Sequence, residues 1–319
     1  MENKMSKQEK PKLSIKNQIE KLKQKGVKFE IFNEDKATKF LQNNSYLFKV
    51  KAYCNTYKQK DKDGKTLPYQ NLDFAYLVDL STIDMHLRRF IIRLTLDMEH
   101  ILKTKLMRDF NNSASDGYDI VAEFLKKDSY VDNFIDEQIK KSSKPTAPAQ
   151  FILRDYKKED LAIWNFIEVI QFGHFINFAK FFYEKYTNDD FNKIKDSLFN
   201  IKCIRNACAH NNCILADLKD NISQPQRQTI DKIFNKKIFK NLTPKGISNN
   251  LKNQTINDFI TLLFVYDEIC KSKDMKKYCY IELVELLTKS LLRNKVFYKN
   301  NILIKARFRF CTRIINYLK

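Results

Sequence analysis

The chain has 319 residues, of which 43% are hydrophobic, so it is long enough for one large or two ordinary domains with a buried core. Lysine and arginine number 58 against 38 acidic residues, which gives a net charge of +20. No apolar run is long enough to cross a bilayer, and the polar N-terminus has no apolar signal core. We therefore expect a cytoplasmic protein whose partners carry dense negative charge: nucleic acid or, as an alternative, an anionic membrane surface.

Only five glycines and six prolines occur, and they cluster between segments of apolar periodicity, which is typical of an all-α fold with few tight turns. Residues 14 to 25 predict a basic amphipathic helix that ends at Gly26, and residues 34 to 43 predict a second short helix. Residues 57 to 70 predict a solvated loop.

The strongest helical pattern of the N-terminal half runs from about residue 72 to residue 110. On its outer face we expect two i,i+4 charge pairs, Asp84 with Arg88 and Glu99 with Lys103. Its apolar side chains recur at spacings of three and four and form one stripe, which we assign to the core: Ile83, Leu87, Phe90, Ile91, Leu94, Met98, Ile101 and Leu102.

Lysine, serine and two prolines gather in KSSKPTAPAQ, residues 141 to 150, and indicate a linker or a long surface loop. We place a domain boundary there. The division is a basic tail over 1–13, an N-terminal helical domain over 14–145 and a second helical domain with a basic C-terminal helix over 146–319. Apolar periodicity in the second domain predicts helices over 160 to 183, 189 to 200, 226 to 240, 255 to 272, 276 to 293 and 302 to 318.

The segment IKCIRNACAHNNC, residues 201 to 213, holds Arg205, Asn206 and His210 within six positions. A guanidinium is permanently charged and can donate to two phosphate oxygens at once, and a histidine exchanges protons near neutral pH. Asn206 is suited to orienting the histidine or a phosphate oxygen. Proton transfer and a fixed cation for the charge that builds on phosphorus are what a metal-free ribonuclease requires.

With the 2′-hydroxyl of the RNA as the attacking group, such a site would cut RNA, spare DNA, and leave a 2′,3′-cyclic phosphate and a 5′-hydroxyl. No metal-ligand cluster surrounds the motif, so we expect neither a metal nor a cofactor. Cys203, Cys208 and Cys213 recur every five residues, which is wider than the usual spacing of tight zinc sites. We interpret all seven cysteines as reduced thiols.

Helix geometry constrains how this motif works. Positions five apart on an ideal helix are rotated by about 140° and separated by about 7.5 Å along the axis. Arg205 and His210 would therefore converge only near a helix start, or with the arginine curled round. A second copy related by a two-fold axis would complete so sparse a site more readily, so we expect a homodimer or a pseudo-dimer.

The sequence around the motif resembles the Abi family of abortive-infection proteins, the AbiD/AbiF-like group, over about residues 14 to 215. LSTIDMHLRRFIIRLTLDMEHILKTKL (80 to 106) is similar to the family helix with its Asp, Leu-Arg and late Glu. LAIWNFIEVIQFGHFINF (161 to 178) is similar to the Trp, Glu and Phe-Gly signature, and IRNACAH (204 to 210) to the Arg-Asn-x-Cys-x-His signature.

The resemblance implies an all-α, HEPN-like helical bundle with an additional N-terminal helical region. It also implies an RNA-directed toxin of phage defence, a HEPN-type ribonuclease, and kinship with relatives restrained by a cognate structured noncoding RNA that acts as antitoxin. Two alternatives stay open: a non-cleaving RNA-binding regulatory module on the same fold, and a membrane-surface protein that uses its basic C-terminus.

Residues 161 to 178 contain further candidates. Glu168 falls in an apolar stripe, where a carboxylate needs a partner; pairing with Arg205 would make it a supporting, orienting group, and the alternative is an ordinary surface glutamate. We expect Trp164 to fill the core, Gly173 to let helices approach, and His174 to be a core or boundary histidine.

Residues 286 to 319 hold nine basic residues and no acidic one, with aromatic residues interleaved. Basic side chains can track phosphates while aromatic rings stack on unpaired bases, so this segment is a candidate RNA contact. The alternative is an ordinary helix with a basic face and buried aromatics. The predicted RNA-contacting residues are Arg293, Lys295, Lys305, Arg307, Arg309 and Arg313.

Overall fold

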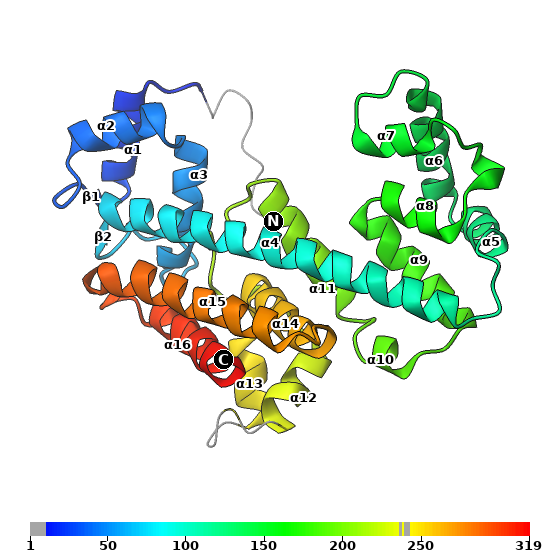
Figure 1. The fold of residues 1–319 in the computed structure, drawn as a ribbon. Helices are drawn as coiled ribbons and strands as arrows, with labels where there is room; N and C mark the ends of the chain where they lie inside the picture. The colour runs from blue at the N-terminus through cyan, green and yellow to red at the C-terminus, as the bar shows by residue number, and fades with distance from the viewer. Residues whose placement is uncertain (1–10, 236–237, 239–242) are drawn as a thin grey trace. The chain divides into compact units, whose positions relative to one another are not determined.

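A computed structural model describes residues 11–235, 238 and 243–319, apart from the side chains of 290–292. Over these residues the fold is all-α, as predicted: helices make up most of it, and the only sheet is a pair of two-residue strands (Figure 1). None of the described helices is both long enough and apolar enough to span a bilayer. Most of the predicted basic tail, residues 1–10, lies outside the described residues.

The N-terminal region is a set of short elements closed by a parallel strand pair. The elements are α1 (Ile15–Gln24), β1 (Val27–Lys28), α2 (Glu34–Asn43), α3 (Leu47–Ala52), the 3-10 helix η1 (Tyr53–Tyr57) and β2 (Leu72–Asp73). β1 pairs with β2 in parallel, with Val27 opposite Leu72. Gly26 follows α1 with φ +89°, and a Cβ there would lie 2.6 Å from the Tyr69 carbonyl oxygen. The predicted end of the first helix at Gly26 is therefore confirmed, and only glycine fits there.

Helix α4 (Phe74–Asn111) is the longest of the described helices and confirms the helix predicted over 72 to 110 (Figure 1, cyan). Its first turn is capped by the buried Asp73, whose Oδ1 accepts a 2.8 Å hydrogen bond from the Ala75 N–H. The other oxygen, Oδ2, accepts from the backbone of Glu30 and Ile31. The same carboxylate thus starts α4 and anchors the loop after β1.

The helix predicted over 160 to 183 is two helices. The chain is extended at Ile170 and Gln171, with ψ of 151° and 155°, between α8 and α9. β-branched residues lose side-chain freedom in a helix, and Val169 and Ile170 stand at this break. The elements here are α5 (Asp119–Lys127), α6 (Ser129–Ser142), α7 (Pro148–Leu153), the 3-10 helix η2 (Lys158–Asp160), α8 (Ile163–Val169), α9 (Phe172–Lys185), α10 (Asp189–Asn192) and α11 (Leu198–Ala209).

Of the five later predicted helices, three are confirmed, one is wrong in extent, and one is confirmed over part of its range. The prediction over 189 to 200 is wrong in extent, because α10 has only four residues and turns precede α11. The helix predicted over 226 to 240 is confirmed at Arg227–Asn235, and its residues 236–237 and 239–240 lie outside the described residues. The elements are α12 (Arg227–Asn235), α13 (Pro244–Asn250), α14 (Gln254–Ile269), α15 (Lys273–Arg293), the 3-10 helix η3 (Lys295–Tyr298) and α16 (Ile302–Leu318).

The chain forms two compact units. The first contains the described residues up to Ile92 together with those in 206–260 and 274–319, and the second contains 93–205 and 261–273. The boundary expected near residue 145 instead falls inside the second unit. There the turn between α6 and α7 is closed by Gln150, which accepts from the Thr146 N–H at 2.8 Å and donates to Gln138 at 3.2 Å. Residues 141 to 150 are therefore a closed turn between packed helices and not a linker.

An aromatic cluster forms part of the core of the second unit. The rings of Phe124, Phe166 and Phe178 meet edge to face with centroids 5.0 to 6.0 Å apart. Edge-to-face pairs of this kind contribute stability beyond the area that they bury. They hold α5, α8 and α9 together and so support the helices that precede the candidate motif.

Candidate functional site

The candidate motif occupies the last turn of α11. Ile201, Ile204 and Cys208 are buried and form the inward stripe of this helix, at spacings of three and four. Arg205 and Asn206 are half-buried, and His210 is exposed immediately after the last helical residue. The motif therefore lies at a helix end, whereas a helix start was one of the two arrangements expected to bring Arg205 and His210 together.

A left-handed residue ends this helix. Asn211 has φ +55°; its N–H donates to the Cys208 carbonyl at 3.0 Å, and the Asn212 N–H donates to the Ala207 carbonyl at 2.9 Å. These two bonds define a Schellman motif, which satisfies carbonyls at the helix end that would otherwise lack donors. The backbone at His210 is therefore fixed, while its imidazole is presented to solvent.

Within the motif, Asn206 and His210 are neighbours along the helix. They lie one turn apart, and the His210 N–H donates to the Asn206 carbonyl at 3.0 Å. On an ideal helix they are offset by only about 40°, whereas Arg205 is about 140° away from His210. On that geometry Asn206 and His210 lie on one face of the helix end, and Arg205 lies on another.

The segment after the motif is held by an ion pair predicted to be on the surface. Asp84 and Arg88 do pair on α4, but both are buried, with Asp84 0% exposed. Asp84 accepts from the Leu215 N–H at 2.7 Å, and Arg88 donates to the Asn212 carbonyl at 3.3 Å. The prediction that this pair lies on the outer face of the helix is therefore wrong. The two charges are buried because backbone groups of residues 212 and 215 form hydrogen bonds with them.

The cysteines near the motif do not share one environment. Cys208 is buried, and burial raises the pKa of its thiol to about 12. Cys203 and Cys213 are half-buried, and the Cys213 thiol donates to the Lys49 carbonyl at 3.7 Å. All seven cysteines of the chain are free thiols, and no three His, Cys, Asp or Glu side chains converge as a metal site within the described residues.

The comparisons with known proteins bear on this motif. A family model described as Abi-like protein matches residues 39–216, which is more than half of the chain and includes Arg205, Asn206 and His210. The chain belongs to the Abi-like protein family. Membership suggests abortive-infection defence against phage. No curated protein and no solved structure gives a significant match.

Within the Abi-like region, residues 39–216, the structure bears on two expectations for α8. Glu168 is exposed, as expected of the alternative, an ordinary surface glutamate, and burial therefore gives it no need of Arg205 as a partner. Trp164 is 43% exposed and does not fill the core, although its ring contacts the rings of Phe110 and Tyr118 at 6.2 and 5.5 Å. Both residues are at the surface because the opposite face of α8 is the buried one.

Three other expectations in the Abi-like region hold. A Cβ at Gly173 would lie 3.1 Å from the Lys202 side chain, so this glycine does let α9 approach α11. His174 is buried against the rings of Tyr130 and Phe134, and burial lowers its pKa. Glu99 and Lys103 form their predicted pair at 3.3 Å.

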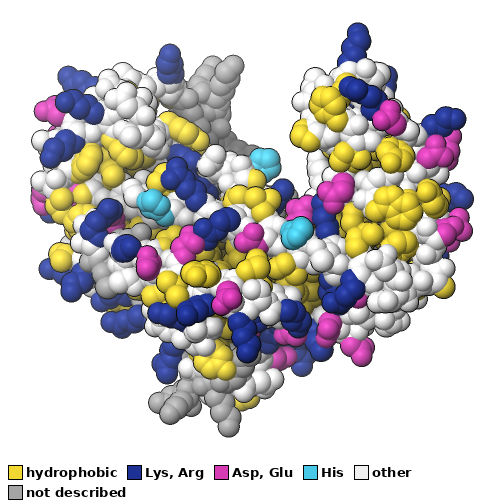
Figure 2. All heavy atoms as spheres, viewed as in Figure 1, with side chains coloured by type: hydrophobic (Ala, Val, Ile, Leu, Met, Phe, Trp, Pro, Cys, Tyr) yellow, Lys and Arg dark blue, Asp and Glu magenta, His cyan; other side chains and the backbone are white. Residues whose placement is uncertain are grey.

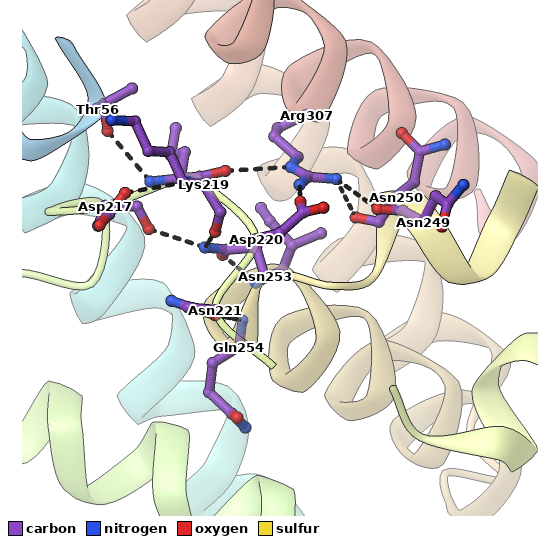
Figure 3. A network of polar contacts seen from close by, with 12 residues as sticks. Thr56, Asp217, Lys219, Asp220, Asn221, Asn249, Asn250, Asn253, Gln254 and Arg307 are labelled. Carbon is purple, nitrogen blue, oxygen red and sulfur yellow. Dashed lines mark hydrogen bonds and ion pairs between the residues drawn. The ribbon is translucent and has the colours of Figure 1, made fainter. Parts of the chain in front are cut away.

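The predicted RNA-contacting residues lie outside the Abi-like region, and Arg307 among them is not a surface residue. It is 5% exposed, and Figure 3 shows its guanidinium within a network of polar contacts. Its guanidinium donates to the carbonyls of Leu218, Asn249 and Asn250 at 2.6 to 3.3 Å and to the carboxylate of Asp220. We therefore assign Arg307 to structure and remove it from the RNA-contacting set.

The other five residues of that set differ in their exposure and in the contacts that their side chains make. Lys295 and Arg309 are exposed. Arg293 pairs with the buried Asp79 at 3.2 Å, while Lys305 and Arg313 donate to the carbonyls of Lys299 and Ile238. Figure 2 shows lysine and arginine side chains spread over the face in view, with acidic side chains among them, instead of gathered in one patch.

Proposed function

We propose that this Abi-like protein is a metal-independent endoribonuclease that acts in abortive infection. The observation that carries the proposal is the placement of an exposed His210 at a rigid helix end, one turn above Asn206 and five residues after Arg205, in a member of this family. A solvent-facing imidazole on a fixed backbone is what proton transfer to a large, external substrate requires.

In this proposal the 2′-hydroxyl oxygen of the RNA attacks the adjacent phosphorus, and the bond from phosphorus to the 5′-oxygen of the next nucleotide breaks. His210 takes the hydroxyl proton and returns it to the leaving 5′-oxygen, so the proton released in the attack completes the 5′-hydroxyl product. Arg205 stabilises the charge that builds on the phosphate oxygens, and Asn206 orients the imidazole or a phosphate oxygen. The products are a 2′,3′-cyclic phosphate and a 5′-hydroxyl.

The proposal includes a homodimer with a shared site. Arg205 and His210 point away from one another by about 140° on an ideal helix, so the arginine that serves one histidine would come from a second copy. Mixing Arg205→Ala with His210→Ala tests this arrangement, because a mixed dimer would contain one intact shared site. Recovery of cleavage in the mixture supports the shared site, and no recovery, with mixed dimers detected, indicates that each copy works alone.

The decisive experiment uses labelled single-stranded RNA in EDTA, with wild type, His210→Ala and His86→Ala compared. His86 is an exposed histidine on α4 and serves as the matched control. General acid–base catalysis contributes about 100- to 10,000-fold, so His210→Ala should lose that much while His86→Ala keeps full activity. Cyclic-phosphate ends are expected. Equal cleavage by wild type and His210→Ala would overturn the assignment of the site.

Intact RNA in every lane, with RNA binding retained, would favour the non-cleaving RNA-binding module. A cognate structured noncoding RNA that restrains the toxin is part of our proposal, because restraint is what a nuclease active on cellular RNA would require. To test for such a noncoding RNA, the protein is purified from the cells that naturally produce it, and the RNA bound to it is sequenced. One enriched, structured RNA whose removal raises cleavage is the expected result.

A further inference from the structure

A hollow of about 360 Å³ opens in the first unit, and its lining includes none of the residues assigned to cleavage. Its lining comes from segments far apart in the sequence: the end of η1, the residues before β2, Tyr76 of α4, Lys219, and the stretch from η3 to the start of α16. Its size is at the lower end of the range of pockets that hold small ligands, about 300 to 1,000 Å³. We call it the Tyr57 pocket.

One wall of the Tyr57 pocket is aromatic. The rings of Tyr76 and Phe297 stack with centroids 4.8 Å apart and an interplanar angle of 26°, and both residues are half-buried. Phe297 is held in place by its neighbours in and before η3. The buried Asp79 accepts from the Asn294 amide at 2.6 Å and from the Tyr298 hydroxyl at 2.5 Å. The ring surface that faces the hollow is therefore fixed before any ligand arrives.

Tyr57 supplies an unused hydrogen-bonding group. Its side chain is only 8% exposed, and its hydroxyl has no hydrogen-bond partner among the described residues. The Asn301 amide approaches the hydroxyl without the geometry of a hydrogen bond. A buried polar group without a partner destabilises the folded state. Tyr57 lines the hollow, but its hydroxyl oxygen is itself buried, so a ligand supplies the missing partner only as the lining side chains move aside.

The remaining lining is cationic and rich in amides. Lys58 is exposed and lines the hollow, and Lys219 donates from its Nζ to the Lys58 backbone carbonyl at 2.5 Å, which places the Lys219 ammonium beside residue 58. The described lining contains no carboxylate. Exposed amides, among them Gln59, Gln70 and Asn300, offer both donors and acceptors. Two hollows of the second unit, both bordered by His100, contain carboxylates and suit an anion less well.

We propose that the Tyr57 pocket binds a nucleotide. The base lies against the Tyr76 and Phe297 wall, where stacking accepts any base, and the amides and the Tyr57 hydroxyl bond to its edge. The phosphate lies at Lys58 and Lys219. The nucleotide comes either from an unpaired position of an RNA strand or from a free nucleoside monophosphate. This inference does not require that the chain cut RNA.

The test measures binding of a fluorescein-labelled, unstructured RNA of about ten nucleotides by anisotropy, in the full chain with His210→Ala so that the probe stays intact. Tyr57→Phe and Phe297→Leu are the test variants. Tyr53→Phe, which changes another buried tyrosine of η1, and Phe48→Leu, which changes an exposed aromatic outside the pocket, are the controls. Adenosine and uridine monophosphates are added as competitors. Thermal unfolding is recorded for every variant.

We expect Tyr57→Phe to weaken RNA binding about fivefold with an unchanged or raised unfolding temperature, because the lost hydroxyl has no partner in the free protein. Phe297→Leu should weaken it about tenfold. Competition by a monophosphate identifies a free nucleotide as sufficient, and RNA binding without such competition identifies the strand; either result supports the pocket. Wild-type affinity in both test variants, or no binding of RNA and monophosphates at all, would overturn it.

Discussion

The carboxylate of Asp84 accepts a 2.7 Å hydrogen bond from the backbone N–H of Leu215, five residues beyond His210. The same carboxylate pairs with Arg88, which in turn donates to the Asn212 carbonyl. A single buried ion pair on α4 thus binds both ends of the segment that follows the motif. The position of His210 depends on this pair because the segment leaves the helix end directly after it.

Replacement of Asp84 should therefore be costly. Asp84→Ala leaves the Arg88 guanidinium buried without its counter-charge and removes the acceptor for Leu215, so we expect a loss of about 3–5 kcal/mol in the free energy of unfolding. Urea denaturation measures it. Glu285→Ala removes an acid from a solvent-exposed i,i+4 pair with Lys289 and should leave the midpoint unchanged. Equal midpoints for the two variants would contradict the structural role of Asp84.

Two arginines two positions apart on α16 should behave in opposite ways. Arg307→Met leaves three backbone carbonyls without a donor, and each unpaired buried group costs about 1–3 kcal/mol, so unfolding should become markedly easier. Arg309→Met changes an exposed residue and should leave stability unchanged while weakening RNA binding and lowering its salt dependence. Denaturation and RNA titrations at two salt concentrations separate the two roles. A stable Arg307→Met variant would refute the assignment.

The end of α11 gives a test of site geometry that leaves the motif residues intact. Asn211 has φ +55°, a conformation that glycine adopts freely and that costs a residue with a branched Cβ about 1–2 kcal/mol or more. Asn211→Gly should keep stability and cleavage, whereas Asn211→Val should lose both because His210 is no longer held in place. Cleavage rates and unfolding midpoints of the two variants are compared. Full activity in Asn211→Val would show that the Schellman end is not needed.

Stability should fall in alkali. Burial raises the pKa of Cys54, Cys208 and Cys311 to about 12, well above the ordinary value of 9.0. Between these values the unfolded chain releases thiol protons that the folded chain keeps, so unfolding becomes easier as pH rises above about 9. Each thiol contributes at most about 1.4 kcal/mol per pH unit.

Urea midpoints measured from neutral pH to beyond pH 9 test this dependence. Cys208→Ala is the matched variant, because it removes one of the three titrating thiols. Its stability should decline less steeply than that of wild type above pH 9, whatever its stability at neutral pH. A slope identical to that of wild type would show that the Cys208 thiol is not protonated in the folded state at alkaline pH, or not buried.

Sequence periodicity predicted α4 because one apolar stripe and a polar remainder leave a clear helical signal. The break between α8 and α9 was missed for the opposite reason. Residues on both sides of Ile170 are apolar on most faces, so a turn between two buried helices leaves the same pattern as one continuous helix.

The charged residues show a second limit of prediction from the sequence. Asp84 and Arg307 were both predicted to face solvent, because a charge on a helix usually does. Each is buried since backbone groups from distant segments complete its hydrogen bonds, 131 residues away for Asp84 and 57 to 89 residues away for Arg307. The candidate motif can be proposed from sequence because its residues are close together in the chain, whereas the Tyr57 pocket combines segments that only folding brings together.

The cluster around Arg307 has a consequence for synthesis on the ribosome. Asp220 is translated 87 residues before the arginine that closes its segment. At elongation rates of about 5–20 residues per second, that delay lasts roughly 4 to 17 s. Throughout it the nascent polypeptide already contains the motif residues but lacks the guanidinium that ties down residues 218 to 220. The segment that follows the motif therefore reaches its final packing only after residue 307 has been synthesised.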